Sequence, residues 1–136
     1  MIVVDASLTI AIILREDNVP NHAQIYDSLG DEPIAVPAHW PAEIANALWV
    51  NYRRNRISKD KLGIAVDYLL AFEPLVDAPP SLQAVARLVQ FAENEKLTVY
   101  DAIYVQLALA REATLATIDA DMRACALKFN IPLLPA

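Results

Sequence analysis

Residues 1–14 read MIVVDASLTIAIIL and residues 115–127 read LATIDADMRACAL, and these two stretches decide the fold. Each runs a few β-forming apolar residues into an aspartate, Asp5 or Asp119, and then into a helical pattern. Strands of unbroken apolar character are typical of a parallel sheet that is covered on both faces. Because ligands of such sheets collect where the strands end, the pattern brings both carboxylates to a candidate binding edge.

Strands and helices alternate along the rest of the chain. We expect short strands at residues 2–5, 34–36, 75–77, 115–117 and 131–134. We expect helices at residues 7–15, 21–29, 41–54, from 58 onward, 81–94, 100–111 and 121–129. The alternation predicts an α/β fold, a three-layer α/β/α sandwich around a short parallel sheet, as one domain over residues 1–136.

Three groups of apolar side chains are expected to pack in the core. The first is the stripe on the helix that begins at residue 58, and the second is the apolar face of the helix at 81–94. The third is a set of aromatic side chains before and within the helix at 41–54. The members are, in that order, Leu62, Val66, Leu69 and Leu70; Leu82, Val85, Leu88 and Val89; Trp40, Trp49 and Tyr52.

Composition excludes several classes of protein. The formal net charge of −6 argues against broad, nonspecific binding of nucleic acid phosphates, but a local basic patch or divalent cations could still supply positive charge. With a single cysteine, Cys125, the chain has no internal disulfide and no thiolate metal cluster. Two glycines are too few for a phosphate-binding glycine loop.

No segment of the sequence predicts a membrane span or a signal peptide. The uncharged runs at residues 6–14 and 102–110 are far shorter than the roughly 20 residues that a bilayer requires. The first residues carry neither a basic start nor a cleavage site. We therefore expect a cytoplasmic protein without a membrane partner.

Four acids lie near expected helix starts: Asp5, Glu43, Asp101 and Asp119. Each one alone could be a helix cap or a charge that suits the helix dipole. Together they lie at one edge of the expected sheet, and Asp101 begins a largely apolar helix where a lone carboxylate would be costly. Oxygen donors without thiolates favour a hard cation, Mg²⁺ or Mn²⁺.

Neither histidine belongs to a convincing catalytic pattern. His22 follows Pro20 and Asn21 at a helix start, and His39 precedes Trp40. Both are interpreted as structural or surface groups, so zinc and a Ser-His-Asp type of nucleophile are not expected.

Four segments in order along the chain resemble the PIN-domain ribonucleases, and specifically the VapC-type toxins of bacterial toxin–antitoxin pairs. The segments are MIVVDAS at 1–7, PAEIANAL at 41–48, LTVYDAIYVQLA at 97–108 and LATIDADMR at 115–123. A single segment is a weak signal, whereas the ordered set is specific and spans the whole chain.

The resemblance implies a role for each acid. Asp5, Glu43 and Asp101 would be the main Mg²⁺ or Mn²⁺ ligands, directly or through water, with Asp119 as a fourth acid and Asp121 as a further, more variable one. The polar side chains that would support them are Ser7, Asn46 and Thr117. The implied reaction is metal-assisted hydrolysis of RNA phosphodiesters, in which Asp101 or Asp119 orients or deprotonates the attacking water.

Partners follow from charge and from the same resemblance. The one dense basic cluster contains Arg53, Arg54 and Arg56, and it is either a solvated helix end or a contact for the RNA backbone. The resemblance further implies a homodimer and a cognate antitoxin. An acidic toxin would suit an antitoxin that offers arginines to the metal site.

Other functions stay open at this stage. A haloacid-dehalogenase-type phosphatase needs D-x-D, but Ser7 occupies the second acid position. A response-regulator receiver needs an early acidic pair besides an aspartate such as Asp77 at the end of a middle strand, and no such pair follows the first expected strand here. The remaining alternatives are a different Mg²⁺-dependent phosphohydrolase and a non-catalytic interaction module on the same fold.

Overall fold

Five parallel strands form one sheet in the order β3-β2-β1-β4-β5. The computed structural model describes all residues from 1 to 136. The strands are β1 (Ile2–Val4), β2 (Ile34–Val36), β3 (Leu75–Val76), β4 (Thr114–Ala116) and β5 (Leu133–Leu134). The helices are α1 (Ala6–Ile13), α2 (His22–Asp31), α3 (Trp40–Arg53), α4 (Lys59–Phe72), the 3-10 helix η1 (Leu82–Ala84), α5 (Val85–Glu95), α6 (Val99–Ala110) and α7 (Ala120–Lys128).

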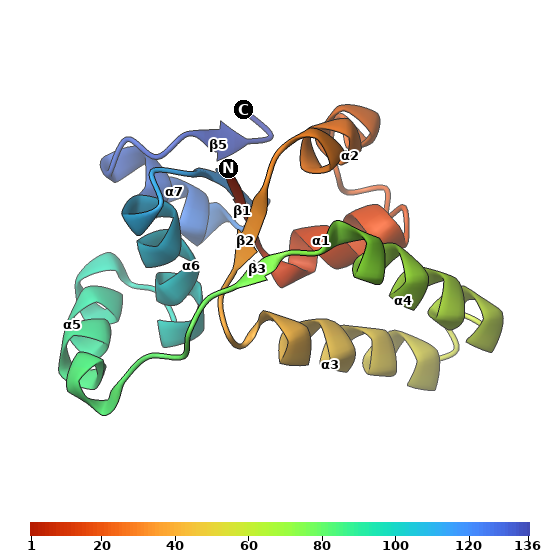
Figure 1. Ribbon diagram of the computed structural model, residues 1–136, viewed down its shortest axis with the longest axis horizontal. Coiled ribbons are helices and arrows are strands. Elements are labelled where there is room, and N and C mark those ends of the chain that lie inside the picture. The colour runs from red at the N-terminus through yellow and green to blue at the C-terminus, as the bar shows by residue number, and fades with distance from the viewer.

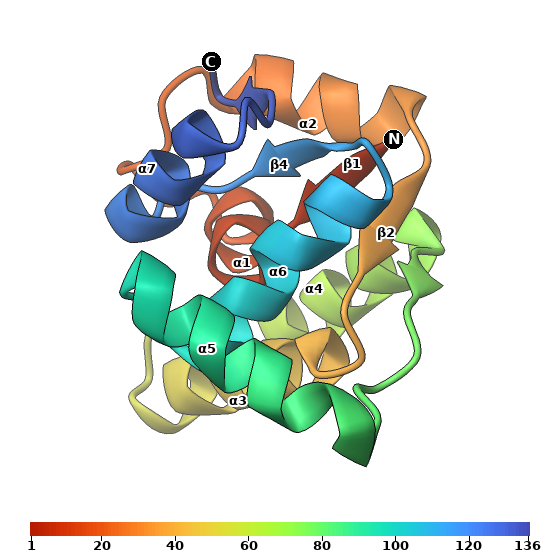
Figure 2. The same ribbon diagram turned by 90° about the vertical axis from the view of Figure 1, so that its left-hand side faces the viewer.

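Helices cover both faces of the sheet, as Figure 1 shows with the strands between two groups of helices. Helices α5, α6 and α7 lie on one side, and α1 to α4 lie on the other, with α1 against α3. Figure 2 shows α6 crossing in front of the strands. The expected three-layer α/β/α sandwich is therefore confirmed.

The centre of the sheet is β1, which pairs with β2 on one side and with β4 on the other. The chain moves outward from β1 to β2 and β3, and then crosses to β4 and β5 on the opposite side. Such a reversal of strand order opens a crevice at the carboxyl ends of the central strands. Asp5 and Thr117 directly follow the register pair Val4 and Ala116, so they begin this crevice side by side.

The core sits where apolar strands meet the inner sides of the helices. All residues of β1 and β2 are buried, and so are most residues of α1. Helix α6 contributes Tyr104 and Val105, which are almost completely buried. The expected burial of the strands IVV and IAV and of the apolar helix at 100–111 is thus confirmed.

Helix starts agree with local capping chemistry. The side chain of Ser58 accepts a hydrogen bond from the backbone N–H of Lys61 at 3.1 Å and starts α4. Asp5, Thr98 and Asp119 cap α1, α6 and α7 in the same way. Element bounds lie close to the expected ones, except that the helix at 81–94 is divided into η1 and α5.

Several apolar side chains that were expected in the core are exposed. On η1 and α5 the buried member is Leu88, because this helix turns only one edge toward α6. Val66 and Leu70 face solvent, while Leu62 and Leu69 pack on the core, so the stripe of α4 is narrower than expected. The other exposed side chains are Leu82, Val85, Val89 and Trp49. Of the aromatic set, Trp40 is buried and Tyr52 is half-buried.

No helix in the structure has both the length and the apolar character that a membrane crossing requires.

Candidate metal centre

Asp5 lies at the bottom of the crevice, and only 2% of its surface is exposed. Its Oδ1 atom accepts a hydrogen bond of 2.5 Å from the backbone N–H of Leu8, which makes it the N-cap of α1. Its Oδ2 atom accepts a hydrogen bond from the hydroxyl of Thr117. Both carboxylate oxygens are therefore held in place, while each keeps a second lone pair for another ligand.

Thr117 connects two of the acids. Besides donating to Asp5, its Oγ1 atom accepts a hydrogen bond of 3.1 Å from the backbone N–H of Asp119. Asp119 in turn caps α7, since its Oδ1 atom accepts from the N–H of Met122 at 2.8 Å. The guanidinium of Arg123 donates to the carbonyl of Thr117 at 2.9 Å, which brings one cation to the rim of the crevice.

Asp101 enters the crevice from the first turn of α6. Its backbone N–H donates to the hydroxyl of Thr98 at 3.1 Å, which is half of a capping box. The reciprocal bond from the Asp101 carboxylate to the backbone N–H of Thr98 is not formed. This half-buried carboxylate is therefore available for a ligand.

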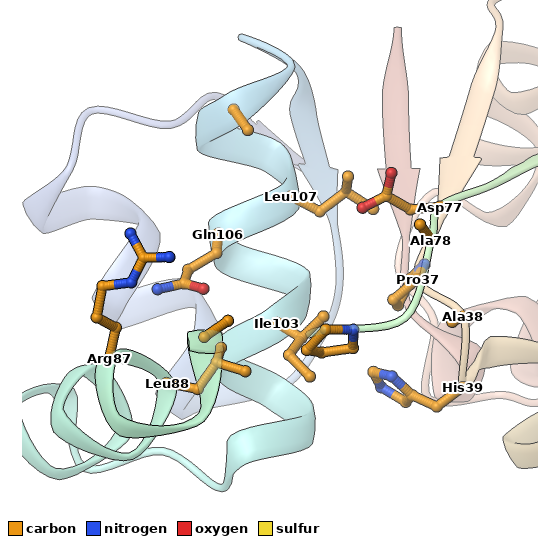
Figure 3. Close-up of a pocket in the computed structure, with 13 residues that line it drawn as sticks. Pro37, Ala38, His39, Asp77, Ala78, Arg87, Leu88, Ile103, Gln106 and Leu107 are labelled. Carbon is orange, nitrogen blue, oxygen red and sulfur yellow. The ribbon is translucent and has the colours of Figure 1, made fainter. Parts of the chain in front are cut away.

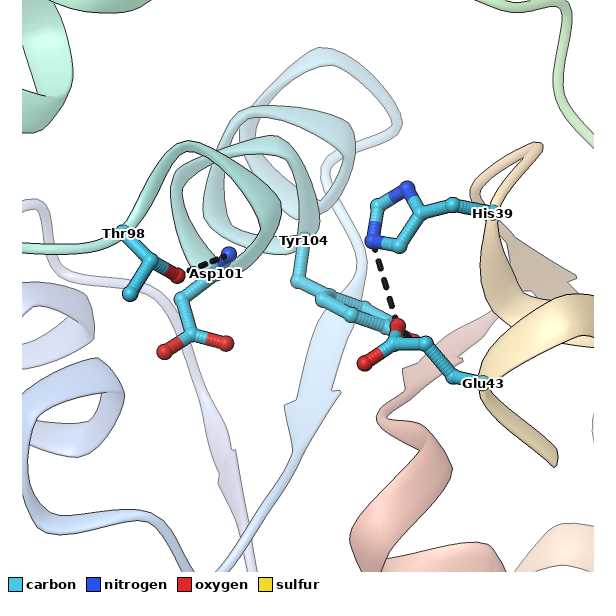
Figure 4. Close-up of polar contacts among 5 residues, drawn as sticks. All are labelled: His39, Glu43, Thr98, Asp101 and Tyr104. Carbon is cyan, nitrogen blue, oxygen red and sulfur yellow. Dashed lines mark hydrogen bonds and ion pairs between the residues drawn. The ribbon is translucent and has the colours of Figure 1, made fainter. Parts of the chain in front are cut away.

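Glu43 reaches the same region from the first turn of α3, and it is oriented by two aromatic side chains (Figure 4). The phenol of Tyr104 donates a hydrogen bond of 2.8 Å to its Oε1 atom. The Nε2 atom of His39 lies 3.2 Å from that same oxygen. Because both contacts use Oε1, the Oε2 atom is left free. In Figure 4 the Tyr104 ring separates Glu43 from Asp101.

The proximity of these carboxylates changes their acidity. Burial raises the pKa of Asp5 to about 6, and the negative charges of Asp119 and Asp101 add to this effect against the hydrogen bonds from Thr117 and Leu8. Burial also raises the pKa of Asp101, and the charges of Asp119 and Glu43 raise it further. The four acids thus form one electrostatic cluster.

Tyr104 keeps its proton throughout the physiological range. Burial raises the pKa of its phenol, and the hydrogen bond to the Glu43 carboxylate raises it further. A phenol that stays protonated acts as a constant hydrogen-bond donor to Glu43.

The donor set fits a hard divalent cation, because four carboxylates converge and no thiolate or imidazole pair accompanies them. No three acidic, histidine or cysteine side chains lie close enough together for direct ligation of one ion. A cation that keeps part of its water shell, as Mg²⁺ does, would suit such a spacing. The sequence-predicted acids are therefore brought into one crevice, but not into a closed ligand shell.

Of the remaining predicted site residues, one contacts the acids and the others lie apart from them. Thr117 supports the acids as expected, whereas Ser7 and Asn46 are exposed and form no side-chain hydrogen bond. Asp121 is exposed in the first turn of α7, outside the cluster of four. The arginine cluster follows the far end of α3, where Arg53 lies ten residues beyond Glu43 and hence about 15 Å further along the helix axis.

Sequence reasoning missed three side chains that shape this crevice. His39 was interpreted as structural, yet it contacts Glu43 one helical turn later. Tyr104 carried a usable signal, since it lies one turn after Asp101 and faces the same side of α6. Arg123 lies one turn after Asp119, and the same spacing rule would have found it.

Comparison with known proteins agrees with this geometry. The family model of the PIN domain matches residues 2–128. No curated protein matches the chain. The crystal structure of PAE2754 from Pyrobaculum aerophilum has 25% sequence identity and a TM-score of 0.67, covering 90% of this chain and 77% of its own.

Two further crystal structures share the fold over nearly the whole chain. FitAcB from Neisseria gonorrhoeae has 19% identity and a TM-score of 0.63, covering 98% of this chain and 96% of its own. VapBC2 from Rickettsia felis, bound to a DNA fragment from their promoter, has 17% identity and a TM-score of 0.62, covering 98% and 97%. With a family model that matches residues 2–128, including four of the five strands and all four acids, the chain belongs to the PIN domain family.

Proposed function

We propose that this chain is a metal-dependent endoribonuclease, with Asp5, Glu43, Asp101 and Asp119 as its active site. The observation that carries the proposal is the gathering of these acids at one place, where burial and then their mutual charge raise the pKa of Asp5 and Asp101. Such a concentration of negative charge in one crevice favours a bound cation. PIN domains are in general nucleases, which supports this reading of the site.

The cation proposed for this site is Mg²⁺ or Mn²⁺. A bound divalent ion would supply positive charge to the phosphate of the substrate and would acidify the attacking water. On the protein side, Leu8 and Thr117 hold the carboxylate of Asp5, and Tyr104 holds that of Glu43. These contacts fix the direction of the ligand oxygens before the ion arrives.

Asp101 is the best placed of the four acids to handle a proton. The pKa of its half-buried carboxyl is raised by burial and by its acidic neighbours, against the hydroxyl of Thr98. In the proposed step it accepts a proton from the attacking water while the new phosphorus–oxygen bond forms. The bond to the leaving ribose oxygen breaks, and that oxygen takes a proton from solvent water.

Asp121 and the exposed arginines are proposed to act at a distance from the cleaved phosphodiester. Asp121 lies outside the cluster and would contribute to the cation only through water. Arg53, Arg54 and Arg56 lie too far from Glu43 for the scissile phosphate, but they suit a more distant part of an RNA backbone.

We also propose that the enzyme is the toxin of a VapC-type toxin–antitoxin pair and forms a homodimer. The net charge of −6 and the acidic crevice suit an antitoxin with a basic segment. The shared fold with structures named for the FitAcB and VapBC2 assemblies supports a protein partner. A cognate antitoxin that binds the chain without inhibiting its RNA cleavage would contradict this assignment. Light scattering of the purified chain tests the dimer.

The single domain and the location in the cell are also proposed. Since all five strands lie in one sheet, residues 1–136 are proposed to act as one domain. The cytoplasmic location stays a prediction, which fractionation of the cell would test.

The decisive experiment is cleavage of a mixed RNA substrate by the partner-free protein. We expect cutting with Mn²⁺ or Mg²⁺, none with EDTA, and loss of activity in Asp101→Asn. The matched control is Asp67→Asn, an exposed acid of α4, which should cleave like wild type. A folded wild type that cuts no class of RNA would favour the non-catalytic interaction module instead.

A further inference from the structure

An apolar recess adjoins the acidic crevice. It lies between the segment after β3 and helices α5 and α6, and its lower part has a volume of about 540 Å³. A second hollow of about 360 Å³ continues it along α6. Both hollows are lined by His39, Pro80, Leu88 and Ile103, so they adjoin each other and are together called the recess.

Aromatic rings form the wall between this recess and the acids. Tyr100 is 63% exposed, and its ring lies 5.3 Å from the ring of His39. The same histidine reaches Glu43 with its Nε2 atom, and Tyr100 directly precedes Asp101. A flat group on the Tyr100 ring would therefore lie next to the acidic crevice.

The far end of the recess carries polar groups. Figure 3 shows the guanidinium of Arg87 and the amide of Gln106 beside one another on one side of the space, with His39 at the opposite end. Arg87 forms no ion pair, and the side chain of Gln106 makes no hydrogen bond within the protein. These two groups are free to contact the edge of a base or a phosphate.

We propose that this recess binds one unstacked nucleobase of a single-stranded RNA, next to the phosphodiester that is cut. The inference rests on the proposed ribonuclease function and adds to it a base-binding subsite beside the acids. An aromatic wall with hydrogen-bonding groups at the far end is how proteins hold bases that have left the stack.

The test measures cleavage of short unstructured RNA oligonucleotides in which the cut has been mapped. Tyr100→Ala should lower kcat/KM by about tenfold, the loss expected for one base–aromatic contact. Tyr100→Phe keeps the ring and should stay within about twofold of wild type. The matched control is Tyr26→Ala on α2, which removes an exposed tyrosine away from the crevice.

A second arm changes the substrate instead of the protein. An abasic site at one nucleotide beside the cut should slow the wild type as much as Tyr100→Ala does, and it should slow that variant no further. A 2-aminopurine at that position should lose fluorescence on binding to Asp101→Asn, but not to the double variant with Tyr100→Ala. This second readout does not depend on cleavage.

The outcomes separate the two proposals. Wild-type cleavage that is unaffected by Tyr100→Ala would overturn the base subsite and leave the ribonuclease intact. Additive losses from the variant and the abasic site would also overturn it. Conversion of a dimer to a monomer by Tyr100→Ala would assign the recess to contact between copies of the chain. Absence of RNA cleavage by wild type would overturn both proposals.

Discussion

Replacing Asp5 with asparagine should stabilise the protein when no divalent cation is present. The buried carboxylate has a pKa of about 6 in the folded state, against an ordinary value of 3.8. The folded state therefore holds the Asp5 proton more tightly than the unfolded chain does. As the pH rises from 4 through 6, this proton is lost and stability falls with it.

The size of the effect follows from the shift in pKa. A difference of about two pH units corresponds to about 3 kcal/mol of unfolding free energy above pH 7. Asparagine carries no charge to desolvate, its oxygen can accept from Leu8, and its amide can donate to Thr117. In EDTA at pH 7.5 we expect Asp5→Asn to unfold about 10 °C higher than wild type.

A divalent cation should remove most of this difference in stability. Binding at 100 times its dissociation constant would stabilise the wild type by about 2.7 kcal/mol. Asp5→Asn lacks one charged ligand of the proposed site, so its melting temperature should rise much less with Mg²⁺ or Mn²⁺. The stabilising effect of the mutation and its loss of cation response have the same physical origin.

The assay is urea or thermal unfolding of both proteins between pH 4 and pH 8, with EDTA and with Mn²⁺. The difference in stability between wild type and Asp5→Asn should be small near pH 4 and grow until about pH 7. Asp67→Asn, an exposed acid, should change stability by less than about 0.5 kcal/mol. A difference that does not vary with pH, or an Asp5→Asn variant that is less stable than wild type in EDTA at pH 7.5, would refute the reasoning. An equal response of both proteins to Mn²⁺ would remove Asp5 from the proposed ligands.

Three further predictions address the groups around the acids. Tyr104→Phe removes the hydrogen bond to Glu43 and should lower Mn²⁺ affinity, measured by calorimetry, by about tenfold; unchanged affinity would mean that the phenol does not orient Glu43. Thr117→Val removes one hydrogen bond from a buried carboxylate, so it should cost about 1.5–3 kcal/mol at pH 8 and less at pH 5 in chemical unfolding; an equal loss at both pH values would contradict the link to charge. If two arginines of the basic cluster contact RNA phosphates, Arg53→Gln with Arg54→Gln should reduce the salt dependence of single-stranded RNA binding by a slope of about 1.4; an unchanged slope would make the cluster a solvated helix end.

Much of the architecture is present in local sequence patterns. Strands such as IVV and IAV are short, apolar and followed by helix-capping residues, so their type and place need no knowledge of distant contacts. The four acids could be placed at one edge because each follows a strand or begins a helix. In a parallel sheet that connection alone brings them to the same side.

The directions of individual side chains were decided by packing between elements that are distant in sequence. Val85 and Val89 satisfy the spacing of a buried face, yet they are exposed because α5 packs mainly on α6 and no element covers these side chains. The same limit applies to Trp49, whose side chain on α3 is exposed. Helical periodicity identifies an apolar stripe but not the neighbour that covers it.

In the site, too, local sequence patterns placed some features and tertiary packing decided the others. Residue types and capping positions were enough to select Asp5, Glu43, Asp101 and Asp119 from the sequence alone. Only the tertiary structure brought Tyr104 of α6 onto a carboxylate of α3, 61 residues earlier in the chain, and Thr117 onto Asp5, 112 residues earlier. Local patterns determine where a carboxylate begins a helix. Its partners, burial and pKa depend on which elements pack around it, because these are properties of the folded surroundings.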